Sequence, residues 1–206
     1  GAASITITNN TVFRDSIANY STGLFYGIYN SGAASTISIN NNTLLGNSTN
    51  SAAGLYYAIY NSGAVTTAIN INGNNIGNAT NSAFTFNAIN SGNQIFIYNS
   101  GGTSASALSI SNNNFQNINY VAAGTGAVTF ISNAAATLSQ ALNGNTFTNL
   151  NENTAGNVTF ISDNVSLSAS GVQNVNNNSI VTGFTKKAGG TITLFTTGAN
   201  SAAGSV

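Results

Sequence analysis

The sequence predicts an all-β protein, folded as one single-stranded parallel β-helix (β-solenoid) of six coils of about 32 residues. A unit typified by Ile37 to Leu44, Ile-Ser-Ile-Asn-Asn-Asn-Thr-Leu, occurs six times along the chain. Its third residue falls at positions 7, 39, 71, 110, 142 and 175, in steps of 32, 32, 39, 32 and 33. Each unit opens with alternating apolar and polar residues, which is the period of a strand with one buried face. Because the repeat covers residues 1–206, we expect a single domain.

Each coil is expected to hold three short strands joined by polar corners. The first opens the unit, as in Ile5 to Thr8. The second is marked by an apolar residue that should point inward: Val12, Leu44, Ile76, Phe115, Phe147 and Ile180. The third is rich in β-branched and aromatic residues and begins at a small residue: Gly23, Gly54, Ala83, Gly126, Gly156 and Gly190. This pattern favours a solenoid over a propeller, whose blades need four antiparallel strands. Six coils at about 4.8 Å spacing would give a rod about 30 Å long.

The coils are expected to start near residues 5, 37, 69, 108, 140 and 173. The long third step is interpreted as an insertion at residues 93–101, which repeats the Ile-Tyr-Asn-Ser-Gly ending of earlier coils. We expect this insertion to bulge from one corner, either as a tolerated loop or as a lateral contact with neighbouring copies.

Asparagine fills the corner after the first strand. Six asparagines share one column: Asn10, Asn42, Asn74, Asn113, Asn145 and Asn178. Asparagine tolerates the left-handed backbone of a tight corner, and its amide can both donate and accept a hydrogen bond. We therefore expect a ladder that fixes the register of the coils, at about 1 kcal/mol per hydrogen bond. A second ladder is expected at Asn30, Asn61, Asn90, Asn133, Asp163 and Thr197.

The Ile-x-Ile-x-x-Asn-x-apolar pattern resembles the repeats of right-handed parallel β-helix proteins. The richness in Asn, Ser, Thr and Gly is similar to that of secreted or surface-anchored microbial repeat proteins. The resemblance covers the whole chain and implies a right-handed coil and an extracellular or cell-surface location. Coils of about 32 residues are longer than is common in that family, which implies a larger or differently cornered cross-section. The resemblance is specific for the fold and not for a function.

Charge is almost absent, which removes most kinds of chemistry. Only six residues are charged: Arg14, Asp15, Glu152, Asp163, Lys186 and Lys187. Although β-helix proteins include polysaccharide lyases and hydrolases, the chain offers no paired carboxylates on one face and has no histidine as a base. We therefore expect no enzyme and no cofactor or metal site. The chain also has no basic surface for nucleic acid and no apolar run that could span a membrane.

The two ends of the array are in the same phase. Gly1 to Ser4 precedes the first coil as Gly32 to Ser35 precedes the second, and Gly198 to Ser201 follows the last strand at the same point. One copy could therefore continue the next, and such a head-to-tail contact generates a filament. The expected joint consists of Ile5, Thr6, Ile7 and Thr8 in the first coil and Thr191, Ile192, Thr193, Leu194 and Phe195 in the last.

The sequence thus favours a structural subunit of an extracellular filament or sheath, a homopolymer whose partner is another copy of itself. A segment of a longer repeat protein would show the same matched ends. The charges near the ends could set the orientation of the joint, or Lys186 and Lys187 could form a solvated loop near Glu152.

A surface adhesin or glycan-binding rod is the alternative function. Two aromatic columns could stack on sugars, one formed by Tyr26, Tyr57 and Phe86 and the other begun by Tyr29 and Tyr60. We favour the interpretation that one column packs inside and the other shields a subunit contact. Ice binding is less favoured, because the column of Thr6 continues as Ser38, Asn70, Ser109 and Ala141. Eight Asn-x-Ser/Thr sequons would suit a glycoprotein, with Asn19, Asn47, Asn78 and Asn157 as candidate sites.

Overall fold

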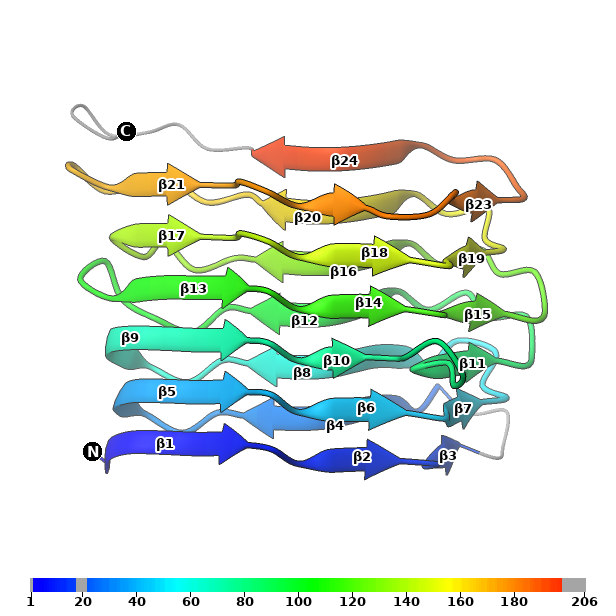
Figure 1. The fold of residues 1–206 in the computed structure, drawn as a ribbon, viewed down its shortest axis with the longest axis horizontal. Coiled ribbons are helices and arrows are strands. Elements are labelled where there is room, and N and C mark those ends of the chain that lie inside the picture. Colours follow the sequence, from blue (N-terminus) through cyan, green and yellow to red (C-terminus); the bar gives the residue numbers. More distant parts are fainter. Residues whose placement is uncertain (1, 18–21, 198–206) are drawn as a thin grey trace.

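The computed structural model describes residues 2–17 and 22–197, and these residues form strands β1 to β24 without a helix. The strands make four parallel sheets of six strands, in which each strand pairs with its equivalents in the coils before and after it. Figure 1 shows the coils stacked from β1–β4 at one end to β21–β24 at the other. The predicted all-β parallel solenoid of six coils is confirmed.

Sheet A contains the first strand of each coil, and its pairs match like residues, such as Ile5 with Ile37 and Ile7 with Ile39. Its strands are β1 (Ala2–Thr8), β5 (Ala34–Asn40), β9 (Val65–Asn72), β13 (Ala107–Ser111), β17 (Ser139–Ala141) and β21 (Val172–Asn174). Sheet B continues it around the asparagine corner. Its strands are β2 (Thr11–Phe13), β6 (Thr43–Leu45), β10 (Asn75–Ile76), β14 (Asn114–Gln116), β18 (Thr146–Thr148) and β22 (Ser179–Ile180).

Sheet C was not predicted, so each coil has four strands and not three. Its strands are β3 (Ser16–Ile17), β7 (Asn47–Thr49), β11 (Phe84–Phe86), β15 (Asn119–Tyr120), β19 (Asn151–Glu152) and β23 (Thr185–Lys186). Sheet D corresponds to the predicted third segment. Its strands are β4 (Leu24–Asn30), β8 (Leu55–Asn61), β12 (Gln94–Asn99), β16 (Val128–Asn133), β20 (Val158–Asp163) and β24 (Ile192–Thr197).

The coil is flat. In Figure 1 the strands of sheets A, B and C run from left to right across the front, and the strands of sheet D return behind them, one step higher. This path makes the solenoid right-handed. The longest axis of the molecule lies along the strands and not along the stack, so the described part of the chain is a slab and not the expected rod.

The corner between sheets A and B depends on a left-handed residue. This residue is the one that precedes the ladder asparagine, and not the ladder asparagine as predicted: Asn9, Asn41, Gly73, Asn112, Gly144 and Asn177, with φ between 57° and 66°. Only Asn and Gly occupy the position, because other side chains rarely adopt a positive φ. The ladder asparagine keeps an ordinary backbone and turns its amide inward.

The core lies between the front sheets and sheet D. Two phenylalanines of sheet B, Phe115 and Phe147, stack with ring centroids 5.1 Å apart. Phe130 and Phe160 of sheet D also stack at 5.1 Å, and Phe130 meets Phe147 edge-on at 5.4 Å. Such stacked and edge-on contacts add about 0.5–1.5 kcal/mol per pair to the burial of the rings.

The position of the insertion in the third coil was predicted wrongly. The segment predicted as an insertion, residues 93–101, contains β12 and pairs with β8 and β16 in the sheet. Most of the extra residues lie earlier, between β10 and β11: Leu44 pairs with Ile76, 32 residues later, whereas Asn47 pairs with Phe84, 37 residues later. The small residue before sheet D is accordingly Gly92 and not Ala83. A Cβ on the next glycine of this column, Gly126, would lie 1.8 Å from the carbonyl oxygen of Gly92.

Candidate functional site

The predicted asparagine column forms a continuous ladder, here called the corner ladder. Its four central members, Asn42, Asn74, Asn113 and Asn145, are fully buried. At each step, the backbone N–H and the side-chain Nδ2 of one asparagine both donate to Oδ1 of the asparagine one coil later, at 2.9–3.1 Å. From the second coil on, Nδ2 also donates to a backbone carbonyl of the coil before, as from Asn42 to Ile7. The ladder therefore ties three successive coils together at each rung.

A second ladder runs along the end of sheet D, with one correction to its predicted members. Nδ2 donates from Asn30 to Asn61, Asn61 to Asn99, Asn99 to Asn133 and Asn133 to Asp163, at 2.7–2.8 Å. Asn99 takes the place predicted for Asn90, because the third coil was out of phase. Asn90 is also buried, but it binds the carbonyl of Ser51 and the N–H of Gly92. Thr197 pairs with Asp163 at the end of the column, as predicted.

A third ladder, here called the outer ladder, was not predicted. It lies two residues before the corner ladder and consists of four asparagines and one serine: Asn40, Asn72, Ser111, Asn143 and Asn176. Each backbone N–H donates to the side chain of the preceding coil. The contacts run from Asn72 to Asn40 at 2.9 Å, Ser111 to Asn72 at 2.8 Å, Asn143 to Ser111 at 3.4 Å and Asn176 to Asn143 at 2.8 Å.

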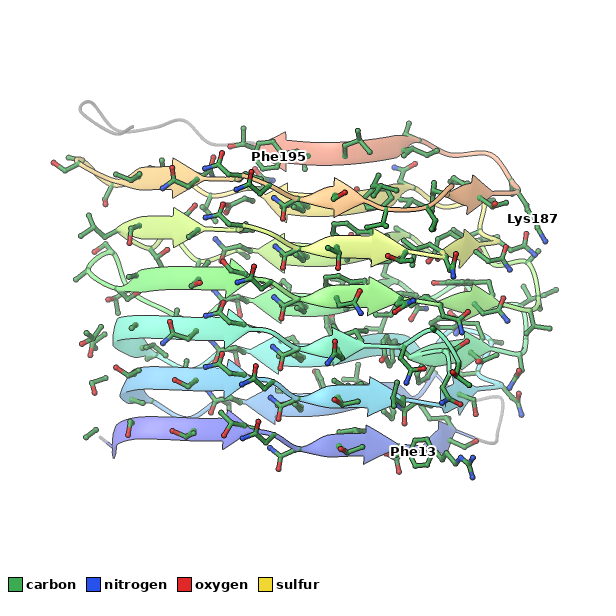
Figure 2. All side chains as sticks on the ribbon, viewed as in Figure 1. Phe13, Lys187 and Phe195 are labelled. Atoms are coloured by element: carbon green, nitrogen blue, oxygen red, sulfur yellow. The ribbon has the colours of Figure 1, made fainter. Side chains whose placement is uncertain are left out.

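The two ends of the stack are open strand edges in the described part of the chain. The N-terminal edge is the outer side of β1–β4, and the C-terminal edge is the outer side of β21–β24. At the N-terminal edge, Ile5, Ile7, Val12 and Phe25 pack on the core but remain partly uncovered. At the C-terminal edge, Ile192, Leu194 and Phe195 of β24 are 52%, 61% and 41% exposed. Figure 2 shows Phe195 at this edge and Phe13 at the other.

The predicted joint residues occupy both edges but belong to different sheets. Ile5, Thr6, Ile7 and Thr8 lie in β1 of sheet A, whereas Ile192, Thr193, Leu194 and Phe195 lie in β24 of sheet D, with Thr191 just before it. If the sheets continued into another copy, β21 would therefore meet β1 and β24 would meet β4. The sequence pattern located the edges but could not assign their partners without the fourth strand.

The tyrosine columns lie on the outer face of sheet D. One column consists of Tyr26 and Tyr57, with ring centroids 5.3 Å apart, and continues as Ile95. The other consists of Tyr29, Tyr60 and Tyr98, at 5.4 and 4.9 Å. Phe86, predicted for the first column, is instead buried in sheet C between Thr49 and Tyr120. In later coils the same two columns carry hydroxyl residues: Thr129, Thr159 and Thr193, and Ser132, Ser162 and Thr196.

Glu152 is a buried carboxyl group in the inward column of sheet C. It is 0% exposed, and neither carboxyl oxygen has a hydrogen-bond partner among the described residues. Burial raises its pKa well above the usual value, although the ammonium of Lys186 in the next coil opposes this. Lys186 donates to the carbonyls of Thr154, Ala188 and Gly189. The predicted solvated loop is therefore wrong for Lys186, which lies in β23 and pairs with Glu152, while Lys187 is exposed and points away from the stack (Figure 2).

Arg14 and Asp163 contact neutral side chains. Arg14 lies over the ring of Phe13, with its guanidinium carbon 4.7 Å from the ring centroid, at the N-terminal edge. Asp163 is buried in the sheet D ladder and accepts from Asn133 and Gln173. Residues 2–17 and 22–197 contain no group of three or more His, Cys, Asp or Glu side chains that could hold a metal.

The candidate glycosylation sites differ in access. Asn47 is fully buried and accepts from the N–H of Asp15, so a glycan on it has no room in the folded chain. Asn78 lies in the loop between β10 and β11, where Oδ1 accepts from the N–H groups of Thr80 and Asn81. Asn157 is exposed just before β20. Asn19 lies outside the described residues.

No family model, curated protein or solved structure matches this chain. Among the residues described, none belongs to a helix long and apolar enough to cross a membrane. What the chain does is therefore inferred from its own geometry, above all from the ladders and the two open edges.

Proposed function

We propose that this chain is a structural subunit that assembles end to end into a filament or sheath, on the outside of a cell. The C-terminal edge of one copy stacks on the N-terminal edge of the next, so that the four sheets continue across the joint. The observation that carries this proposal is that the two edges are opposite sides of the same parallel ladders. Such a contact does not close on itself, and repetition extends it into a filament. The resemblance to secreted microbial β-helix repeats supports the location.

Apolar burial supplies a driving force at sheet D. Continuing the sheet places Ile192, Leu194 and Phe195 of one copy beneath Phe25, Gly27 and Ile28 of the next. Full burial of an aliphatic or aromatic side chain is worth about 1.5–3 kcal/mol, so covering the exposed half of three such side chains contributes about 2–5 kcal/mol. Gly27 has no side chain, which leaves room for the most exposed of them, Leu194.

Sheet C opposes the contact. Lys186 ends its inward column and would lie beneath Ile17 of the next copy. Charged residues that point inward at an edge discourage strand pairing. The cost is reduced because the ammonium already donates to three carbonyl groups. Sheets A, B and D must therefore hold the joint, and Lys186→Met should lower the concentration at which the chain assembles.

Electron microscopy and sedimentation of the purified chain test the proposal. We expect fibres with an axial repeat of six strand spacings, about 29 Å, that persist at high salt because the contact is not ionic. Leu194→Asp should abolish them by placing a carboxylate in the apolar stack. Asn157→Asp is the matched control, since it adds the same charge on the exposed face of sheet D. A wild-type chain that remains monomeric at every concentration would refute the proposal.

A glycan-binding rod is the second candidate. The observation in its favour is the patch on sheet D that consists of the exposed Tyr29, four half-buried tyrosines and the exposed Leu24 and Leu55, since such patches often mark interaction sites. Because neighbouring rings in the two columns lie with centroids 4.9–5.4 Å apart, they cover part of one another's faces. Titration with neutral oligosaccharides, followed by tyrosine fluorescence, tests this function. Binding that Tyr60→Ala removes would favour it over assembly.

A further inference from the structure

The corner ladder has a direction. At each of its five steps the donors are the N–H and Nδ2 of the earlier coil, and the acceptor is Oδ1 of the later coil. Its first rung, Asn10, therefore has no donor for its own Oδ1 among the described residues. Its last rung, Asn178, uses Nδ2 toward the carbonyl of Leu142, and its backbone N–H has no partner in the described chain. The N-terminal edge thus presents an acceptor and the C-terminal edge presents donors.

The outer ladder runs the opposite way. There the donor is the N–H of the later coil and the acceptor is the side chain of the earlier coil. At the C-terminal edge this leaves Oδ1 of Asn176 as an acceptor with no partner among the residues described. The equivalent donor of the first coil is the backbone N–H of Thr8, because Thr8 pairs with Asn40.

The two ladders stand one residue on either side of the left-handed corner. The C-terminal edge therefore presents a hydrogen-bond acceptor at Asn176 and a donor at Asn178. The N-terminal edge presents a donor at Thr8 and an acceptor at Asn10. These two pairs are complementary when the edges of two copies meet head to tail with the strands parallel and in register.

We propose that these opposed ladders set the direction and register of the joint between two copies of this chain. Asn178 donates to Oδ1 of Asn10 in the next copy, and Thr8 of that copy donates to Oδ1 of Asn176. This inference rests on the proposed function and adds the groups that specify it. Head-to-head docking would reverse the strands of one copy relative to the other, so the parallel ladders could not continue across it. A slip of two residues would oppose like groups, and a slip of one residue would turn the apolar column of sheet A outward.

Charge variants at the C-terminal edge separate direction from simple adhesion. Asn178→Asp keeps the acceptor for Asn145 but turns a joint donor into a carboxylate that faces Oδ1 of Asn10. Asn176→Asp keeps an acceptor where an acceptor is required. Asn177→Asp adds the same charge at the exposed corner residue between them, which has no place in either ladder.

The measurement is the critical concentration for assembly, by sedimentation at pH 7 and at pH 3, with circular dichroism to check folding. At pH 7 we expect Asn178→Asp to raise the critical concentration about tenfold or more, and Asn176→Asp and Asn177→Asp to change it little. At pH 3, below the usual carboxyl pKa of about 3.9, protonation restores a donor, and Asn178→Asp should approach Asn177→Asp.

The outcomes distinguish the two proposals. If the wild-type chain assembles and Asn178→Asp behaves like Asn177→Asp at both pH values, the ladders do not specify the joint, while the proposed function stands. If Asn176→Asp blocks assembly as strongly as Asn178→Asp, direction is likewise not encoded there. If the wild-type chain never assembles, both proposals fall.

Discussion

Replacing Asn74 by alanine should destabilise the fold more than any change at the ends of the corner ladder. Its Oδ1 accepts from the N–H and Nδ2 of Asn42, at 2.9 and 3.0 Å. Its Nδ2 donates to the carbonyl of Ile39 and to Oδ1 of Asn113, both at 2.9 Å. Alanine removes these four hydrogen bonds. The groups that bonded to Asn74 then lie where water cannot replace it, because Asn42, Asn74 and Asn113 are fully buried.

The loss in the free energy of unfolding can be estimated from the groups left without a hydrogen-bond partner. Three are left without a partner: the N–H of Asn42, one of the two N–H bonds of its Nδ2 and the carbonyl of Ile39. The other N–H of that Nδ2 still donates to the carbonyl of Ile7. Oδ1 of Asn113 keeps the backbone N–H of residue 74. A buried group that loses its hydrogen bond costs about 1–3 kcal/mol, so with some relaxation we expect a loss of about 3–6 kcal/mol. Asn10→Ala is the matched control. It removes only donors on an exposed rung and should cost about 0–1 kcal/mol.

Urea unfolding followed by far-ultraviolet circular dichroism measures both variants. The midpoint urea concentration should fall far more for Asn74→Ala than for Asn10→Ala. The dependence of the unfolding free energy on urea concentration should be similar in both if unfolding stays cooperative. A difference between the two variants of less than about 1 kcal/mol would refute the reasoning, because the buried amides would then not depend on one another.

Three further predictions follow. Burial raises the pKa of Glu152 above its ordinary 4.5 in the folded chain. Stability should therefore be complete below about pH 4.5 and fall as pH rises toward the folded pKa, by up to about 1.4 kcal/mol per pH unit. Urea titrations from pH 4 to 9 should show a larger fall in the wild type than in Glu152→Gln, in which burial still raises the pKa of Asp163, and equal pH dependence would contradict the prediction. Gly126→Ala should destabilise severely, because its Cβ would lie 1.8 Å from the Gly92 carbonyl oxygen, whereas Gly183→Ala meets nothing within 4 Å and should be nearly neutral in thermal unfolding. In a glycosylating host, mass spectrometry should find sugar on Asn157 or Asn78 and none on Asn47; a glycan on Asn47 of the folded chain would contradict its burial.

The sequence predicted the parts of the fold in which the repeat is regular. The columns of Ile7 and Asn10 were found because the alternation and the asparagine recur at a constant offset. Sheet C was missed because strands such as Ser16–Ile17 and Asn151–Glu152 are too short to show alternation. For the same reason the burial of Glu152 was not predicted, although every second residue of that segment points inward.

The third coil shows how one insertion misleads a repeat alignment. Extra residues between β10 and β11 shifted the phase, and the aromatic strand Phe84–Phe86 was taken for the start of sheet D. The true phase is marked by Gly92, which occupies the glycine column, and by the ending Tyr98-Asn99, which matches Tyr60-Asn61. The outer ladder was not predicted because Ser111 interrupts its asparagines. Serine in place of asparagine keeps a hydrogen-bond acceptor but breaks the recurrence of one residue type.

The flat coil has a consequence for the appearance of any assembly. Stacked slabs make a tape with two unlike surfaces and not a round fibre. The front surface over sheet A is mostly polar and has no aromatic column, as in the column of Thr6, Ser38, Asn70, Ser109 and Ala141. The back surface alternates between three coils of tyrosine and three of threonine and serine. A tape built in this way would carry an aromatic band across one side only, once in every six coils. Tapes lying back to back could align by matching the aromatic band of one tape to that of the next. The repeat along each tape would then also set the alignment of neighbouring tapes in a sheath.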